Sequence, residues 1–360
     1  MRRRDFLLSA GAATAGFALS KAVPLVADTD EANWRTFEVT TRAEVLNPEG
    51  ETRIWLPAAL IRNTPFQRTL ANKFTADGGT AKFTEIKQGD VGIVSGSYPA
   101  GTKPVLTLSS RVSLKNYTVD LSQPQHPHVS RTELEYYLQP TKFIPTNGIV
   151  KETALKATKG AVKDVEKARA IYEWIVDNTF RDPKVRGCGR GDIRFMLESR
   201  DLGGKCADLN ALYVGMARAV GLPARDVYGL RVAKSELGYK SLGISSEKAT
   251  KAQHCRAEVY LKDYGWVPVD PADVRKVVLE EPPGNRPMND EMVSKARSRL
   301  FGSWEMNWMA YNYAHDVALP GSKLSPLVFF MYPQSETASG RIDPLDPENF
   351  RYDIIVKEIA

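Results

Sequence analysis

The sequence predicts an α+β protein: an N-terminal antiparallel, β-sandwich-like domain, followed by a domain in which a helix packs on an antiparallel sheet. Three observations support this class. Apolar and polar residues alternate over residues 34–137, which is typical of half-buried strands. After residues 140–145 the apolar residues recur at helical spacing instead. A helix with an apolar face, within residues 203–221, then precedes three short strand-like segments.

The first residues are typical of an export signal. Arg3-Arg4 precedes the apolar stretch Phe6–Leu19, which matches the twin-arginine pattern. Cleavage is expected after Ala27, with cleavage after Ala22 as the alternative. No other apolar stretch is long enough to span a bilayer. We therefore expect a mature chain with no stable membrane span, exported by the twin-arginine route to the periplasm or beyond. The alternative is an uncleaved amphipathic anchor.

The composition limits the classes of partner. The formal net charge is +6, part of it in the leader, and no basic stretch is interleaved with aromatic residues. We therefore expect no nucleic-acid partner. The three cysteines allow one disulfide and one free thiol in an oxidising compartment. A Cys188–Cys255 bridge is one possibility, and two small buried hydrophobic residues are the other.

Residues 28–140 are expected to form the β-rich domain. Residues 37–45 alternate strictly, Asn47–Gly50 is a turn, and residues 52–56 read as the return strand. Further alternation and a hairpin signal at Asp77-Gly78-Gly79 continue the pattern. The proline-rich loop at its end contains His126 and His128. No third ligand is near them, so we expect a solvated loop rather than a metal site.

Residues 141–360 are expected to form the second domain with a C-terminal extension. A helix over residues 164–178 comes first, and the glycine-rich stretch Arg186–Gly191 is expected to be a tight structural turn, since it lacks the spacing of a phosphate-binding loop. The polar segment 235–253 is expected to be a mobile loop beside the site. The remaining expected elements are a short helix at 192–198, strands at 226–232, 254–261 and 266–270, a helix at 289–300, and closing strands at 327–332 and 350–359.

Cys206 stands at the first turn of the helix within residues 203–221. Unpaired backbone N–H groups and the helix dipole favour an anion there, which lowers the pKa of a thiol and favours the reactive thiolate. A structural cysteine would more often lie in the middle of the apolar face. We therefore expect Cys206 to be a nucleophile.

A nucleophilic cysteine needs a base within hydrogen-bonding reach, and the base needs a third group that fixes its tautomer. His254 opens one expected strand and Asp270 closes the next, across the turn at Asp263–Gly265. Antiparallel pairing of these strands can bring the two side chains together, with the helix of Cys206 across the sheet. The spacing thus favours a Cys206–His254–Asp270 triad.

These blocks resemble those of the transglutaminase-like superfamily, within the wider group of papain-like cysteine folds. The family's cysteine block begins with G-x-C and ends in G-[IL]-P-A-R, and this chain has Gly204-Lys205-Cys206 and Gly221-Leu222-Pro223-Ala224-Arg225. The family's second block, H-x-W-x-E-V-Y…G-W-x-x-x-D-P, matches His254–Tyr260 and Gly265–Pro271. The resemblance implies a bacterial exported member in which Cys206 is the nucleophile, His254 the general acid and base, and Asp270 the orienting acid.

One position departs from the family pattern. Arg256 stands where the family has tryptophan, on the same strand face as His254 by alternation. It either recognises a substrate carboxylate or pairs with Glu258 on the same face. Two further groups are expected to be structural rather than functional: the His315-Asp316 pair, and the aromatic residues Trp304, Trp308, Tyr311 and Tyr313, which otherwise could line a substrate groove.

The expected reaction is acyl transfer or amide hydrolysis through a thioester on Cys206, with the side chain of a glutamine or a peptide amide as substrate. The same residues would serve a water or an amine as acceptor of the acyl group, so hydrolysis and amine transfer both stay open. No acidic loop resembles a calcium site, and we expect no metal and no cofactor. The alternative from another class is a non-catalytic periplasmic module that binds peptide and keeps a vestigial triad.

Overall fold

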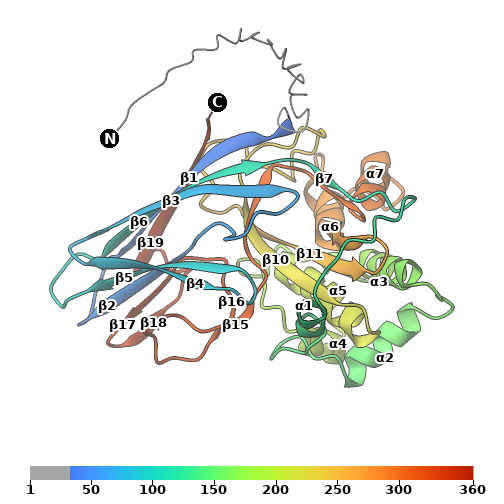
Figure 1. Ribbon diagram of the computed structural model, residues 1–360, viewed down its shortest axis with the longest axis horizontal. Coiled ribbons are helices and arrows are strands. Elements are labelled where there is room, and N and C mark those ends of the chain that lie inside the picture. Colours follow the sequence, from blue (N-terminus) through green and yellow to red (C-terminus); the bar gives the residue numbers. More distant parts are fainter. Residues whose placement is uncertain (1–32, 360) are drawn as a thin grey trace, which may run out of the picture. The chain divides into compact units, whose positions relative to one another are not determined.

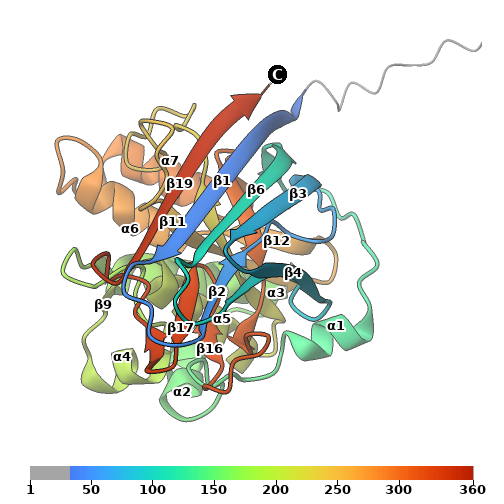
Figure 2. The ribbon, with the colours of Figure 1, turned by 90° about the vertical axis from the view of Figure 1, so that its left-hand side faces the viewer.

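Two antiparallel sheets pack face to face as a β-sandwich in the computed structural model, which describes residues 33–359 (Figures 1 and 2). The expected export signal lies outside these residues. Alternate apolar residues of both sheets form the core between them, among them Ala43, Leu56, Val94, Leu108 and Phe350. The first sheet has the strand order β19 (Phe350–Ile359), β1 (Arg35–Val45), β6 (Val105–Leu114), β3 (Gln67–Asp77), and the second has β18 (Gly340–Ile342), β17 (Gln334–Thr337), β2 (Thr52–Pro57), β5 (Val91–Tyr98), β4 (Thr80–Ile86).

The C-terminal strands belong to this sandwich. β19 pairs along the whole of β1, from Thr36 opposite Ile359 to Val45 opposite Phe350, and β17 pairs with β2. Figure 2 shows β19 and β1 side by side at the edge of the sheet. The C-terminal part of residues 141–360, which was expected to extend the second domain, thus contributes strands that pair with strands of the N-terminal region. Alternation predicts a strand, but it does not identify the strand with which it pairs.

The second part of the fold is a four-stranded antiparallel sheet with helices packed around it (Figure 1). Its strand order is β12 (Gly265–Val269), β11 (Gln253–Leu261), β10 (Ala224–Arg231), β14 (Trp308–Asn312). The helices are α1 (Arg131–Tyr136), α2 (Gly148–Ala157), α3 (Asp164–Asn178), α4 (Ile193–Ser199), α5 (Cys206–Ala219), α6 (Pro271–Glu280) and α7 (Glu291–Arg299). Three short strand pairs complete it: β7 (Tyr117–Thr118) with β13 (Ser303–Trp304), β15 (His315–Val317) with β16 (Leu327–Phe329), and β8 (Phe180–Arg181) with β9 (Gly203–Gly204).

The helix α5 lies at the centre of this part. The sequence predicts one buried face, whereas every residue from Cys206 to Arg218 is buried. The reason is that α2, α3 and α6 cover the sides of α5 that do not lie on β10 and β11. Arg218 is accommodated because its guanidinium donates to the carbonyl oxygens of Ala224 and Gln139, both at 2.8 Å.

The predicted α+β class is confirmed, and so is the β-rich character of the N-terminal region. The predicted helix at 164–178 coincides with α3, while α2 and α6 were not predicted. The limits at residues 27 and 140 stay predictions. Within residues 33–359, no helix combines the length and the apolar character needed to cross a bilayer.

Candidate active site

A network of hydrogen bonds fixes the start of α5, where Cys206 is the first helical residue. The Asp208 carboxylate accepts from the backbone N–H of Lys205 at 2.9 Å, of Arg190 at 2.8 Å and of Gly191 at 2.9 Å. Asp208 thereby ties the glycine-rich loop to the first turn of the helix. The position of Cys206 at the positive end of α5 follows from this arrangement.

The glycines of this loop allow its backbone to approach Asp208 closely. Gly189 has a φ of +96°, and a Cβ atom on it would lie 1.8 Å from Asp208 Oδ2. A side chain is therefore excluded at this position by both conformation and space. The loop is the structural turn that the sequence predicts, and it also shapes the surroundings of Cys206.

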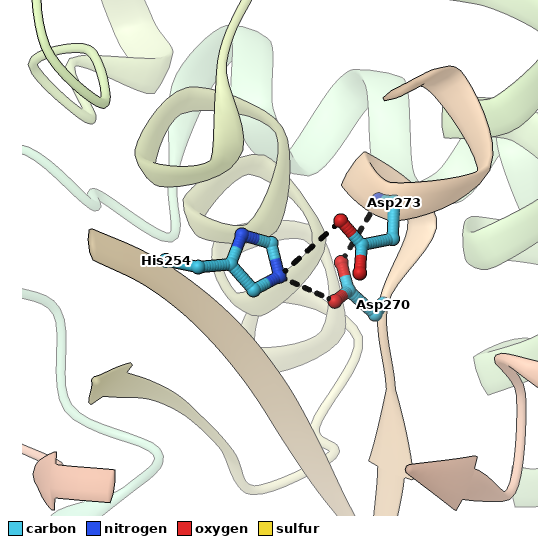
Figure 3. Close-up of side chains that lie close together, drawn as sticks. All are labelled: His254, Asp270 and Asp273. Carbon is cyan, nitrogen blue, oxygen red and sulfur yellow. Dashed lines mark hydrogen bonds and ion pairs between the residues drawn. The ribbon is translucent and has the colours of Figure 1, made fainter. Parts of the chain in front are cut away.

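His254 and Asp270 lie together as the strand spacing predicts (Figure 3). His254 is near the start of β11, and Asp270 follows β12 directly, as the N-cap residue of α6. The distance from His254 Nε2 to Asp270 Oδ2 is 2.7 Å, and both side chains are buried. The hydrogen bond leaves Nδ1 as the ring nitrogen available to Cys206, which lines the same cleft as His254 and whose pKa His254 lowers.

The second carboxylate oxygen of Asp270 is also used. Asp270 Oδ1 accepts from the backbone N–H of Asp273 at 3.0 Å and from Asn210 Nδ2 at 3.3 Å. The first contact caps α6, and the second comes from α5, one turn beyond Cys206. Asp270 thus links the helix that holds the nucleophile to the strand that holds the base.

Asp273 and Arg231 belong to the same cluster, and the sequence reasoning missed both. Asp273 Oδ1 lies 3.4 Å from His254 Nε2 and 2.5 Å from Arg231 Nη2 (Figure 3 shows the first contact). Burial favours the neutral form of Asp273, but the Arg231 guanidinium outweighs it and holds the pKa of that carboxyl well below its usual range. Asp270-Pro271 is typical of a helix start, and Asp273 in the first turn of that helix could have been singled out from this signal.

His254, Asp270 and Asp273 each offer one ligand atom within 4.8 Å of the others, so they are the residues here that could hold a metal ion. Two guanidinium groups already neutralise these carboxylates. Arg231 contacts Asp273, and Arg256 Nε lies 3.8 Å from Asp270 Oδ2. The observed contacts are therefore those of a hydrogen-bonded His–Asp cluster with its own buried cations.

The electrostatics favour a thiolate on Cys206. Hydrogen bonding with Cys188 and Cys255 lowers the pKa of the Cys206 thiol well below its usual range, against the effect of burial, and His254 lowers it further. For His254, burial and Arg231 favour the neutral ring, but Asp273 and Asp270 outweigh them and raise the pKa. These opposite shifts favour a thiolate–imidazolium pair.

All three cysteines are free thiols, so the Cys188–Cys255 disulfide is not formed. Cys188 Sγ lies 3.3 Å from the carbonyl oxygen of Gln253, and both Cys188 and Cys255 interact with Cys206. Cys255 follows His254 on β11, so alternation directs its side chain to the opposite face of the strand, and it nevertheless interacts with the nucleophile. It faces α5, as alternation with His254 requires, and the nucleophile stands on the end of that helix.

Arg256 lies on the His254 face of β11, but that face is covered. Its guanidinium stacks over Trp308 at 4.7 Å from the ring centroid and donates to the carbonyl oxygen of Glu305 at 3.0 Å. The side chain is only 3% exposed, so the geometry gives no support for contact with a substrate carboxylate. Nor does it pair with Glu258, whose carboxylate binds Arg225 Nε at 2.7 Å.

The other groups singled out in the sequence have structural surroundings. His315 Nε2 lies 3.2 Å from Asp226 rather than pairing with Asp316, and His126 lies 3.3 Å from Asp263 on the surface. Four aromatic residues at 304–313 are buried in the core, and of these Tyr313 also lines a second cavity: Trp304, Trp308, Tyr311 and Tyr313.

Cys206 and His254 line a cleft of about 600 Å³. One wall is the loop at residues 243–252, and another comes from C-terminal residues that include Tyr332 and Tyr352. The loop is anchored to β19, where Ala249 N–H donates to Ile354 at 2.8 Å and Thr250 Oγ1 accepts from Ile354 N–H at 3.0 Å. The expected mobile loop thus lies beside the site and is held by the sandwich.

The chain is similar to known proteins both in sequence and in fold. Residues 151–271 match the model of the transglutaminase-like superfamily. An uncharacterized protein of Haemophilus influenzae is 31% identical over 363 residues, which cover 92% of this chain and 95% of that protein.

Solved structures are also similar. A crystal structure of a candidate cysteine protease from Cytophaga hutchinsonii has a TM-score of 0.51 and 15% identity, and the match covers 90% of this chain and 98% of that one. The periplasmic domain of TgpA from Pseudomonas aeruginosa has a TM-score of 0.33 and 14% identity over 67% of this chain and 88% of that domain. The first of these shows the same fold. The family match supports a general cysteine-dependent function.

Proposed function

The chain belongs to the transglutaminase-like superfamily, and from this we propose that it is a cysteine-dependent amide hydrolase that works through a thioester on Cys206. The observation that carries the proposal is the 2.7 Å hydrogen bond from His254 to Asp270, beside a cysteine at the start of α5 in an open cleft. The superfamily includes both peptidase-like and acyl-transferring enzymes. We propose hydrolysis because water is always present as acceptor in an exported protein.

The first half of the proposed reaction forms the acyl-enzyme. The Cys206 thiolate attacks the carbonyl carbon of a peptide or glutamine amide, and a C–S bond forms as the C–N bond breaks. The imidazolium of His254 gives its Nδ1 proton to the departing amine. The backbone N–H of Cys206, at the positive end of α5, is placed to donate to the developing oxyanion.

The second half releases the acid. Neutral His254 takes a proton from water, whose oxygen attacks the thioester carbonyl, and the C–S bond breaks to regenerate the thiolate. Asp270 supports both halves because its hydrogen bond to Nε2–H keeps Nδ1 directed at Cys206 and stabilises the imidazolium. An amine that replaces the water would give a crosslinked product by the same steps.

We also propose that residues 1–27 direct the protein through the twin-arginine route to the periplasm or beyond. The Arg3-Arg4 pair before an apolar stretch supports this. Replacing both arginines by lysine should retain the protein in the cytoplasm, as measured by fractionation of cells. Normal export of that variant would exclude the twin-arginine route.

The experiment that tests the proposed function compares the purified protein with its Cys206→Ala variant on a mixture of peptides, with mass spectrometry of the products. We expect cleaved or deamidated peptides from the native protein alone. A trapped acyl-enzyme should be lighter than the sum of enzyme and substrate by the mass of the departing amine, which is ammonia (about 17 Da) for a glutamine side chain and the released peptide fragment for a peptide bond. A second reaction with added methylamine tests for amine transfer.

Cys206 reactivity gives an independent readout. We expect iodoacetamide to alkylate Cys206 faster than it alkylates glutathione at about pH 6, since the thiolate persists in the protein at that pH. Peptide binding without turnover, together with a Cys206 that reacts no faster than glutathione, would instead indicate the non-catalytic binding module.

A further inference from the structure

The charged residues that line the catalytic cleft are all cationic. Seven of the lining residues are lysine or arginine, and among the described residues that line the cleft none is aspartate or glutamate. The formal charge of the whole chain is only +6 among 49 basic and 43 acidic residues, so this segregation is local rather than a reflection of composition. A ligand in the cleft therefore meets positive groups on several sides.

Several of these cations have carboxylate partners, but those partners are not among the residues that line the cleft. Arg186 pairs with Asp343, and Lys248 Nζ lies 3.2 Å from Asp353 Oδ1. Neither carboxylate is among the residues that line the cleft. The carboxylate partners of these two residues thus lie outside the lining of the cleft, whereas the basic side chains form part of its wall.

Lys205 and Lys251 differ from these residues, because neither forms an ion pair within residues 33–359. Lys205 is the N-cap residue of α5, directly before Cys206, where the helix dipole adds to its positive charge. Lys251 lies on the anchored loop that forms one wall, and it is exposed. Two uncompensated cations in a shared concave site attract an anion more strongly than they would on a flat surface.

We propose that the acyl donor is an acidic peptide, with carboxylate side chains or a terminal carboxylate close to the amide that Cys206 attacks. This inference rests on the proposed function and names its substrate class. Lysine and arginine at the wall can bind carboxylates by charge-assisted hydrogen bonds, and a neutral or basic peptide would leave those cations desolvated without a partner. Arg256, which is covered by aromatic residues, takes no part in this recognition.

The test uses two small electrophiles that differ in charge, iodoacetate and iodoacetamide. The rate of Cys206 alkylation is measured with each reagent at neutral pH. The rate with iodoacetate is divided by the rate with iodoacetamide, and this ratio is divided by the same ratio measured for glutathione. We expect this normalised ratio to favour iodoacetate by about tenfold or more at low salt and to fall as salt screens the cleft. The imidazolium of His254 also attracts iodoacetate, so variants are needed to isolate the contribution of the lysines.

The double variant Lys205→Gln/Lys251→Gln should lower the normalised ratio of the iodoacetate rate to the iodoacetamide rate by about three- to tenfold, because only the anionic reagent is attracted by the two charges that are removed. The matched control is Lys151→Gln/Lys262→Gln, which removes the same charge at two exposed positions outside the cleft and should leave the ratio unchanged. Equal effects of the two double variants, or a ratio in the native protein no higher than that of glutathione, would overturn the inference.

A pair of peptides that differ only by glutamate or glutamine beside the scissile amide tests the substrate class directly. We expect a higher kcat/KM for the glutamate peptide and loss of that preference in Lys205→Gln/Lys251→Gln. A preference for the glutamine peptide would refute the acidic class. Failure of the proposed function can be distinguished from failure of this inference. If Cys206 is not a reactive nucleophile, it would react no faster than glutathione with neutral iodoacetamide as well as with iodoacetate.

Discussion

Replacing Asp270 by asparagine tests the role of its carboxylate, because both oxygens accept hydrogen bonds from fixed donors. Oδ2 faces His254 Nε2 at 2.7 Å, whereas Oδ1 faces the backbone N–H of Asp273 at 3.0 Å and Asn210 Nδ2 at 3.3 Å. An asparagine has only one oxygen, so its NH₂ group must face a donor in either orientation. We expect the NH₂ group to face His254. In that orientation only the His254 N–H loses its acceptor, whereas the opposite orientation would deprive both the Asp273 N–H and Asn210 Nδ2 of theirs.

In that orientation the Asp270→Asn variant loses the partner of Nε2–H. The imidazolium is no longer stabilised, or the ring adopts the tautomer that carries its proton on Nδ1, facing Cys206. A hydrogen bond to a charged group contributes about 1.5–3 kcal/mol. Since about 1.4 kcal/mol corresponds to a factor of ten, alkylation of Cys206 at about pH 6 should slow by roughly 10- to 100-fold.

The assay is the rate of Cys206 alkylation by iodoacetamide across pH 4–9, with the adduct located by mass spectrometry, and the melting temperature of each variant. The loss should be largest at acid pH, because Asp270 helps to raise the pKa of His254 in the native protein and the positive partner of the thiolate would be weakened. Asp263→Asn is the control, since Asp263 is an exposed acid on the turn between β11 and β12.

The opposite orientation predicts a different result. If the asparagine oxygen faces His254, alkylation stays close to native, and the cap of α6 is lost at about 0.5–2 kcal/mol, which lowers the melting temperature. Native alkylation together with a native melting temperature would refute the reasoning, because one of the two sets of donors must lose its acceptor.

Three further results are expected. Arg225→Met leaves its buried carboxylate partner uncompensated, so the free energy of unfolding should fall by about 3–5 kcal/mol in urea titrations, while alkylation of the folded fraction stays native. Gly189→Ala, which directs a Cβ atom into the carboxylate of Asp208, should slow Cys206 alkylation and lower the melting temperature far more than Gly160→Ala, a glycine of similar φ with open space around it. Burial opposes ionisation of Asp273, but a buried guanidinium outweighs it and lowers the pKa of this carboxyl in the folded protein. The ionised carboxylate therefore stabilises the fold fully above pH ~4, and this stabilisation is lost progressively as the pH falls further. The difference in melting temperature between the native protein and Asp273→Asn should narrow as the pH falls towards about 3.

The parts of the site that depend on local signals were readable in the sequence. A cysteine between glycines and an apolar helix indicates a helix start, and His254 and Asp270 stand at the ends of strands joined by a short turn. Strand pairing across one hairpin then brings the last two together, because the register of β11 and β12 is set by that turn.

Contacts between distant segments were not readable. Arg231 meets Asp273 only because β10 and α6 are both packed around α5, and neither residue carries a local signal of the other. Alternation correctly placed Arg256 on the face of His254, but it could not show that Trp308 and the backbone of Glu305 cover that face. The partners of the C-terminal strands depend in the same way on the packing of the whole sandwich.

The anchoring of the cleft loop by β19 has a consequence for synthesis of the protein. Thr250 and Ile354, which join the loop to the strand, are 104 positions apart in the chain. Cys206, His254 and Asp270 therefore leave the ribosome well before the strand that supports the wall of their cleft. β19 also pairs with β1, whose residues are made first, so the first and last strands must meet before the sheet closes. A nascent chain that already contains the three residues would thus lack the finished cleft, and the reactive thiol would be matched to a substrate only after the final strand has joined the sheet.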